Sequence, residues 1–213
     1  MIKGATTRIG IYGTSGCGKS TLAKQLIKPI ERIIVFDPMA EYEAQGFTVV
    51  KSVVDLLKHS KSKKFKLAYQ MNVDAKHSDE LAKVAQAVFL VQKPYAEGKN
   101  FPQMTFLIEE MALSIPNVQN AKSLSYMTNM ANMGRHFGIN LIGIAQRPAN
   151  VNTTVRACFT ENYFFMMNLM NDIQAVSEFI GKTNANKILQ LNRHEAIHYM
   201  EGKTIEKHKN ILD

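Results

Sequence analysis

Short apolar runs alternate with longer amphipathic segments along most of the chain. The apolar runs are typical of buried strands and occupy residues 9–12, 32–36, 47–50, 65–70, 104–108, 139–145 and 161–167. Between them, apolar residues at spacings of three and four predict helices at 19–28, 52–58, 79–95, 122–133, 153–159, 172–180 and 184–191. Strands that alternate with helices in this way predict an α/β fold, a mostly parallel central sheet flanked by helices.

The end of the chain departs from this alternation. Residues 194–200 and 204–207 are strand-like on either side of Gly202, which predicts a C-terminal β-hairpin. His194 and His198 are four residues apart, but the strand-like pattern predicts that both lie on one face of this ribbon, and we assign no metal to them.

The other boundaries come from polar residues and glycine. Residues 112–120 are polar and predict a loop, and Gly134 is expected to end the preceding helix as its C-terminal cap.

The length of the chain suits one domain that spans 1–213. We expect no signal peptide and no transmembrane segment, because the longest apolar runs are too short to cross a bilayer.

The first apolar run leads directly into a glycine-rich loop. Residues 13–20 read GTSGCGKS, a full match to the phosphate loop G-x-x-x-x-G-K-[ST]. Glycines let the backbone N–H groups approach phosphate oxygens, Lys19 brings a positive charge, and the Ser20 hydroxyl can bind Mg²⁺. The following helix directs its positive dipole end at the same phosphates. We therefore predict that ATP and Mg²⁺ bind at Gly13, Thr14, Ser15, Gly16, Cys17, Gly18, Lys19, Ser20 and Thr21.

A pair of acids closes the apolar run at 104–108. An apolar strand that ends in Glu109 and Glu110 fits the second nucleotide motif, in which the first acid holds Mg²⁺ and the second polarises the attacking water. Glu109 is therefore the expected metal-side acid, and Glu110 is the expected catalytic residue. The metal-side acid of this motif is usually aspartate, so the longer side chain of Glu109 departs from the usual pattern.

Polar residues also follow two other predicted strands. Gln146 follows 139–145, where its amide can hydrogen-bond both the γ-phosphate and the catalytic water. Asp37 follows 32–36 and opens a turn with Pro38. Turn capping and ligand binding at the carboxyl edge of the sheet are alternative roles for Asp37.

The composition is basic. The chain has 26 Lys and Arg against 18 Asp and Glu, a formal net charge of +8. This balance favours a polyanionic partner. The lysine-rich segment 58–66 is more typical of a solvated loop than of a DNA contact. The two cysteines, Cys17 and Cys158, indicate no disulfide framework.

Three stretches together resemble the FtsK–HerA superfamily of DNA-pumping ATPases. They are the phosphate-loop run Arg8 to Lys19, FDPMAEY from Phe36 to Tyr42, and GRHFGINLIGIAQRP from Gly134 to Pro148. The third stretch is the most specific, because many ATPases share only the first. This basic chain shows none of the membrane-anchoring or clamp-docking domains of full-size cellular members. It therefore looks most like the genome-packaging ATPases of tailless, membrane-containing double-stranded DNA viruses.

The resemblance implies a RecA-like P-loop NTPase fold with a strand inserted between the phosphate-loop strand and the acid-bearing strand. Residues 139–145 fit as that strand, which would put Gln146 beside the γ-phosphate. The resemblance also implies a ring of identical subunits, expected to be a hexamer, in which an arginine of one subunit completes the ATP site of its neighbour. Arg135 is the first candidate for this arginine and Arg156 the second, whereas Arg147 is expected to stay near its own site or to brace the interface.

We therefore expect an ATP-driven translocase that packages a viral genome into a preformed capsid. Its expected partners are double-stranded DNA, further copies of itself, capsid-vertex or portal proteins and the internal membrane of the virion. It would act in the host cytoplasm or at the virion vertex. Residues 117–122, which follow the acid-bearing strand, are the expected pore loop.

Other functions fit some of the same features. One alternative is a HerA-like repair or plasmid-transfer motor. Another is a nucleotide-dependent assembly factor that moves no DNA. A small-molecule kinase is disfavoured, because the sequence has no arginine-rich lid segment.

Overall fold

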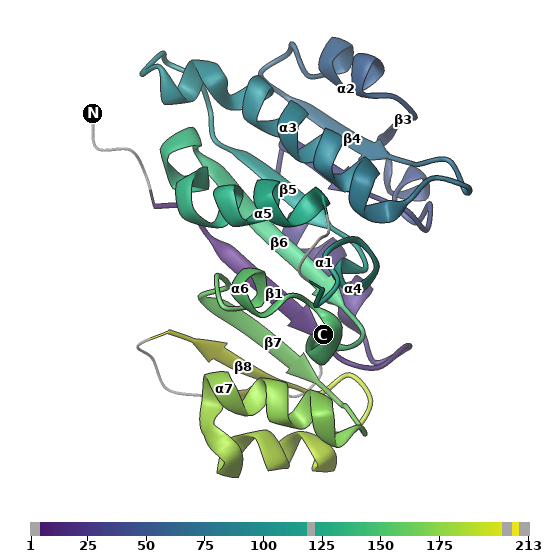
Figure 1. The fold of residues 1–213 in the computed structure, drawn as a ribbon, viewed down its shortest axis with the longest axis vertical. Coiled ribbons are helices and arrows are strands. Elements are labelled where there is room, and N and C mark those ends of the chain that lie inside the picture. Colours follow the sequence, from purple (N-terminus) through teal and green to yellow (C-terminus); the bar gives the residue numbers. More distant parts are fainter. Residues whose placement is uncertain (1–4, 119–121, 202–205, 209–213) are drawn as a thin grey trace.

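One sheet runs through the chain in the computed structural model, which describes residues 5–118, 122–201 and 206–208 (Figure 1). The strands lie in the order β3-β4-β2-β5-β6-β1-β7-β8-β9. Neighbours from β3 to β7 are parallel, and β8 and β9 continue the sheet antiparallel. Their bounds are β1 Arg8–Tyr12, β2 Arg32–Phe36, β3 Thr48–Val50, β4 Phe65–Tyr69, β5 Met104–Ile108, β6 Ile139–Ala145, β7 Glu161–Phe165, β8 Ala196–Met200 and β9 Glu206–His208.

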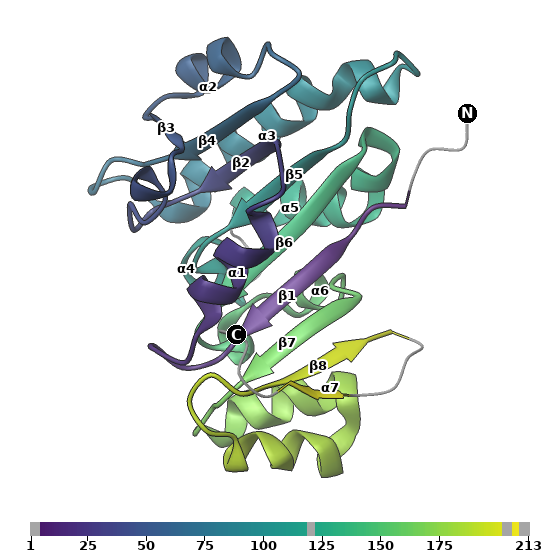
Figure 2. The ribbon, with the colours of Figure 1, turned by 180° about the vertical axis from the view of Figure 1, so that it is seen from behind.

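Helices cover both faces of the sheet. On one face lie α3 and α5 (Figure 1), and on the other lies α1 (Figure 2). The α-helices are α1 Lys19–Ile27, α2 Val53–His59, α3 His77–Ala96, α4 Met111–Ser114, α5 Lys122–Met133, α6 Thr153–Arg156 and α7 Met170–Asn186. Short 3₁₀ turns are η1 Glu43–Gln45, η2 Gly134–Phe137, η3 Pro148–Asn150 and η4 Lys187–Gln190.

Strand β2 shows why its residues form a central strand. Ile33 and Val35 pack into the core on the α1 side, and Ile34 and Phe36 pack into the core on the α3 and α5 side. Because side chains alternate between the two faces and both faces are covered, every residue of β2 is buried.

The position of β6 decides which residues meet at the carboxyl edge. It lies between β5 and β1, as the predicted inserted strand should. Tyr12 pairs with Ala145, and Ile108 pairs with Gly143. The phosphate loop, the two acids and Gln146 therefore follow three adjacent parallel strands.

Some local predictions are wrong. The predicted loop 112–120 begins inside the short helix α4, which starts at the fully buried Met111 and ends at Ser114. Gly134 does not cap α5: it begins η2, and Gly138, with φ 66°, ends that turn.

The C-terminal region agrees with the expected pattern. Gly181 (φ 75°, ψ 158°) breaks α7 into the two helical pieces that were predicted. Strands β8 and β9 pair antiparallel, as the predicted hairpin requires, and residues 202–205 between them lie outside the described residues. Among the described helices, none combines the length and apolarity that a membrane crossing requires.

Candidate nucleotide site

The phosphate loop follows β1 and turns at three glycines. Gly13, Gly16 and Gly18 have φ values of 150°, 73° and 111°. These values lie in the left-handed region, which glycine adopts without strain. A Cβ on Gly13 would also lie 2.6 Å from Phe165 Cβ and 2.9 Å from Cys17 Sγ. The backbone of the loop therefore requires its glycines.

Neighbouring strands hold the start of the loop. The Gly13 N–H donates to Ala145 O at 3.3 Å, and the Thr14 N–H donates to Met166 O at 3.0 Å. Lys19 is 7% exposed, and its Nζ donates to Thr14 O at 2.8 Å. The lysine charge is therefore fixed along the loop and not in bulk solvent.

Helix α1 begins directly after the loop. Gly18 is its N-cap residue, no side chain in the described part of the protein caps the helix, and its first turn contains no acid. The N–H groups and the positive dipole end of α1 are therefore available to an anion. Ser20 is partly exposed and Thr21 is exposed in this first turn.

Glu110 and Gln146 meet where β5 and β6 end. The Gln146 N–H donates to Glu110 Oε1 at 3.5 Å. Burial raises the pKa of Glu110, while hydrogen bonds from Gln146 and the charge of Lys19 lower it. The residues expected to act in hydrolysis are Lys19, Glu110, Gln146 and Arg135, and the structure brings the first three together.

The backbone at Glu110 is strained. Its φ is 45°, and it is the N-cap residue of α4. A left-handed conformation costs a side-chain-bearing residue about 1–2 kcal/mol. Strain of this kind concentrates at functional sites, where the surrounding structure enforces it.

Glu109 lies deeper than Glu110. It is 7% exposed, and the Tyr42 hydroxyl donates to its Oε1 at 2.5 Å. Burial raises the pKa of Glu109 to about 7, and the Tyr42 bond acts in the opposite direction. The motif FDPMAEY therefore supplies, through Tyr42, a direct partner of the expected metal-side acid.

The donors near the loop suit Mg²⁺. A magnesium ion takes oxygen ligands, and in nucleotide sites it needs only one or two protein ligands besides phosphates and water. The Ser20 hydroxyl and the Glu109 carboxyl are oxygen donors of this kind. No group of three His, Cys, Asp or Glu side chains converges on a metal position in the part of the chain that the structure describes.

Asp37 forms a turn. Its Oδ1 accepts the Glu41 N–H at 2.9 Å, and its Oδ2 accepts the Tyr42 N–H at 3.1 Å. Asp37 is fully buried, and burial raises its pKa. Of the two predicted roles, the geometry favours turn capping, which in turn places Tyr42 beside Glu109.

Arg135 lies far from its own phosphate loop. It is exposed in η2, which precedes β6, whereas Gln146 follows that strand. The length of β6 separates the two ends by about 20 Å. Arg135 therefore cannot act on the nucleotide of its own chain, and its side chain is accessible to a neighbour.

The other two candidate arginines are held within the chain. Arg156 is buried, and it donates to Pro148 O at 2.7 Å and to Glu178 Oε2 at 2.7 Å. These contacts argue against Arg156 as the second candidate for a trans-acting arginine. Arg147 donates to Asp172 Oδ2 at 3.1 Å, so it too has a partner within its own chain.

The sequence analysis missed two residues at the loop. The Arg193 Nε donates to Gly16 O at 2.9 Å, and the His194 N–H donates to Cys17 O at 3.2 Å. The expectation that His194 and His198 share one face of a strand is wrong. His194 lies in the turn before β8, while His198 lies in β8 and contacts Glu161 Oε1 at 2.9 Å.

Cys17 is buried inside the loop. Burial raises the pKa of its thiol, and the nearby Lys19 lowers it. A buried thiol with a raised pKa is a poor nucleophile at neutral pH. Cys17 therefore acts as a small packing side chain, as expected.

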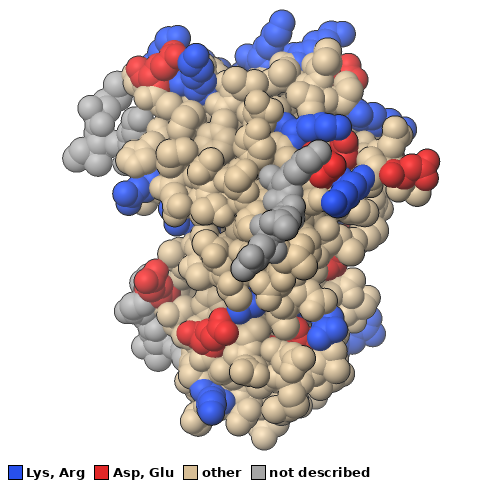
Figure 3. Space-filling model, in the orientation of Figure 1, with Lys and Arg blue, Asp and Glu red and all other residues tan. Residues whose placement is uncertain are grey.

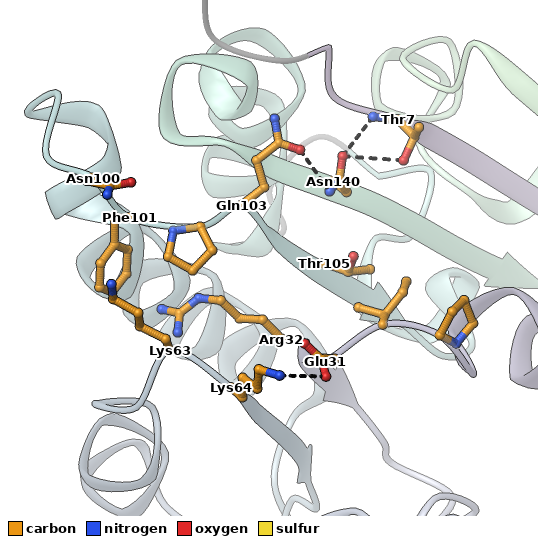
Figure 4. A pocket seen from close by; sticks show the side chains of 13 residues that line it. Thr7, Glu31, Arg32, Lys63, Lys64, Asn100, Phe101, Gln103, Thr105 and Asn140 are labelled. Atoms are coloured by element: carbon orange, nitrogen blue, oxygen red, sulfur yellow. Dashed lines mark hydrogen bonds and ion pairs between the residues drawn. The ribbon is translucent and has the colours of Figure 1, made fainter. Parts of the chain in front are cut away.

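A pocket of about 620 Å³ lies at the opposite, amino-terminal edge of the sheet (Figure 4). Arg32 lines it, with its guanidinium 4.4 Å and 4.5 Å from the ring centres of Phe65 and Phe101. The same group donates to Ser62 O at 2.5 Å and to Gln92 Oε1 at 3.4 Å. Burial lowers the pKa of Arg32 to about 10. These contacts tie together the elements around the start of β2, and the pocket is not part of the nucleotide site.

Comparison with known sequences gives one family match. The family described as "Helicase HerA, central domain" matches residues 2–101, which include the phosphate loop and FDPMAEY. Among curated proteins, none is similar enough to this chain to count as a relative.

Comparison with solved structures gives matches over nearly the whole chain. The genome packaging NTPase B204 of Sulfolobus turreted icosahedral virus 2 has a TM-score of 0.78 and 22% identity, covering 97% of this chain and 98% of that one. VirB4 of Thermoanaerobacter pseudethanolicus has a TM-score of 0.66 and 10% identity, covering 97% and 90%. The bacterial conjugative coupling protein TrwB has a TM-score of 0.65 and 10% identity, covering 95% and 84%.

The structural matches agree with the architecture of the sheet. The family match spans the first two of the three sequence motifs, and both comparisons support the resemblance inferred from them. The chain has a P-loop NTPase fold, and its residues 2–101 match the family described as "Helicase HerA, central domain".

Proposed function

We propose that this chain is an ATP hydrolase that moves double-stranded DNA and packages a viral genome into a preformed capsid. The observation that carries the proposal is the meeting of Glu110 and Gln146 next to the phosphate loop. B204, which is similar in fold over nearly the whole chain, is a genome packaging NTPase studied with AMP and ATPγS. That similarity supports both the nucleotide and the packaging role. The whole chain, 1–213, would act as one ATPase domain.

In the proposed site, the loop binds the phosphates of ATP. The N–H groups at the start of α1 and the Lys19 amine would contact the β- and γ-phosphates, because they provide the positive potential at this edge. Ser20 and Glu109 would hold Mg²⁺, which supplies neutralisation of the charge on the phosphate oxygens.

Glu110 and Gln146 would act on the attacking water. A carboxylate with a raised pKa is a better proton acceptor at neutral pH, and burial raises the pKa of Glu110. Gln146 contacts Glu110 through its backbone N–H and through its side-chain amide. With ATP bound, the side-chain amide would instead orient the water and contact the γ-phosphate. Hydrolysis would therefore depend on both strand ends.

A neighbouring subunit would complete the site. Arg135 is exposed and distant from its own loop, so in a ring it would reach the nucleotide of the next copy. An arginine supplied in trans can raise the hydrolysis rate by about 10³–10⁵. We propose a closed ring, a hexamer by family resemblance.

The motor would grip the DNA backbone without reading its sequence. The net charge of +8 supports a polyanionic partner. On the face shown in Figure 3, lysines and arginines are scattered towards the margins and do not form one patch. The proposed pore loop at 117–122 includes residues 119–121, which lie outside the described residues.

The test is ATP hydrolysis with and without duplex DNA across a salt series. We expect stimulation by DNA that falls as salt rises, because phosphate contacts release counterions. Lys19→Ala and Glu110→Gln should each abolish hydrolysis, whereas Lys182→Ala, which removes an exposed charge elsewhere, should not. Hydrolysis that ignores DNA, together with failure to displace a triplex strand, would instead support an assembly factor.

A repair or conjugation motor is the second candidate. The HerA central-domain match and the similarity in fold to VirB4 and TrwB favour it. Both candidates move DNA, so translocation alone does not separate them. With empty capsids present, a packaging motor should convert DNA to a nuclease-protected form. DNA that is moved but stays nuclease-sensitive would favour the second candidate.

A further inference from the structure

A turn from the C-terminal half of the chain contacts the phosphate loop. Residues 192–195 precede β8, whose antiparallel direction brings its start to the carboxyl edge of the parallel strands (Figure 2). There Arg193 donates to Gly16 O at 2.9 Å and His194 donates to Cys17 O at 3.2 Å. Two consecutive carbonyl groups of the loop are thus held from outside.

These bonds fix two peptide planes. In a trans peptide, the carbonyl of one residue and the N–H of the next point in opposite directions. Because the Gly16 carbonyl is directed at Arg193, the Cys17 N–H points away from the turn. In the same way, the Cys17 carbonyl is directed at His194, and the Gly18 N–H points away. Backbone N–H groups in this part of a phosphate loop are the ones that cradle phosphates.

We propose that the turn at 192–195 is a positioning element of the nucleotide site. Arg193 and His194 hold the loop so that its N–H groups face the phosphates before a nucleotide binds. The exposed Arg193 also adds a positive charge beside the loop. The proposal rests on the proposed function only in that the loop binds nucleoside polyphosphates.

The turn is built as a rigid unit. Glu195 Oε2 accepts the Asn192 N–H at 2.9 Å, and the Glu195 N–H donates to Asn192 O at 3.1 Å. His194 has φ 69°, a strained value for a residue with a side chain. A Cβ on Gly18 would lie 3.0 Å from His194 Nδ1, a buried atom with no hydrogen-bond partner among the residues that the structure describes. The strain and the buried nitrogen both occur where the turn meets the loop.

The test compares ADP with AMP. ADP carries a β-phosphate for the loop to bind and AMP does not, so loss of loop orientation should affect ADP selectively. Affinities would be measured by displacement of a fluorescent ATP analogue in the presence of Mg²⁺. We expect Arg193→Ala to lower the affinity for ADP about tenfold, which is the loss that one charge-assisted hydrogen bond represents. The affinity for AMP should stay within about twofold of wild type.

Conservative variants separate the hydrogen bond from the charge. Arg193→Gln can still donate to Gly16 O but is neutral, and it should recover most of the ADP affinity. Lys182→Ala is the control for the loss of one exposed charge, and it should bind ADP normally. Equal losses for ADP and AMP, no loss for ADP, or recovery only in Arg193→Lys would each overturn the positioning role. A protein that binds ADP but hydrolyses ATP without regard to DNA would contradict the motor and leave this test intact.

Discussion

Among single residues, Glu109 combines burial with a partner that restricts its chemistry. Tyr42 donates to one of its oxygens, and Asp37 holds the turn that places Tyr42 there. A protonated Glu109 cannot serve as a magnesium ligand, because Mg²⁺ binds the carboxylate. In the proposed site, the pKa of Glu109 would therefore link metal binding to pH in the neutral range.

This pKa also predicts how stability changes with pH. The pKa is raised from 4.5 to about 7, so the folded protein keeps a proton that the unfolded chain loses between those values. The resulting stabilisation is present below pH 4.5 and is lost as pH rises to about 7. Urea unfolding should show wild type losing roughly 2 kcal/mol more than Glu109→Gln between pH 5 and pH 8. The same pH dependence in both proteins would show that Glu109 ionises normally.

Site residues could be predicted from the sequence where they directly follow a single strand. The phosphate loop and the pair Glu109–Glu110 each directly follow an apolar run, and the structure places both at the carboxyl edge. The Arg193 contact joins positions 177 residues apart, and no local pattern reports such a contact. Arg156 was the second candidate for the trans-acting arginine, but it is buried and donates to Pro148 O in the turn before α6.

At the scale of elements, strand predictions agreed best with the structure. Buried parallel strands are continuous apolar runs, so β2, β5 and β6 begin and end where the hydrophobic pattern does. Helix α4 has only four residues, too few to show a helical period. Gly134 and Gly138 both stand near the end of α5, and only the backbone angles distinguish which one caps the turn.

Strand β6 gives a prediction at this scale. A Cβ on Gly143 would overlap Met111 Sδ and would lie 2.6 Å from Phe159 Cζ. Gly143→Ala should therefore cost about 1–3 kcal/mol of unfolding free energy by overpacking. Because Met111 directly follows Glu110, hydrolysis should also fall while ADP binding is retained. Urea unfolding and ATPase assays measure the two effects.

Gly134→Ala is the matched control for this substitution. A Cβ there would meet only ordinary contacts, the nearest at 3.6 Å. Its stability should stay within about 0.5 kcal/mol of wild type. If Gly143→Ala likewise left the unfolding free energy and the rate of ATP hydrolysis unchanged, the packing of β6 against α4 would not position Glu110.

At the scale of the whole molecule, the proposed ring predicts complementation between two inactive variants. Lys19→Ala lacks a working loop, and Arg135→Ala lacks the group offered to the neighbour. Each alone should be inactive, but about a quarter of interfaces in an equal random mixture would pair an intact loop with an intact arginine. ATPase activity of mixed and reassembled subunits measures this. A mixture as inactive as its components would remove Arg135 from the trans role.

Gln146 and Arg135 stand beyond opposite ends of one strand that is paired along both sides. Stretching or bending such a strand would break its hydrogen bonds to the two neighbouring strands, so we expect β6 to move as a rigid unit. If Gln146 shifted when the γ-phosphate leaves, β6 would transmit the shift to Arg135. Arg135 would in turn affect ATP hydrolysis in the neighbouring subunit. ATP hydrolysis would then proceed from one subunit to the next around the ring, and β6 would set the order.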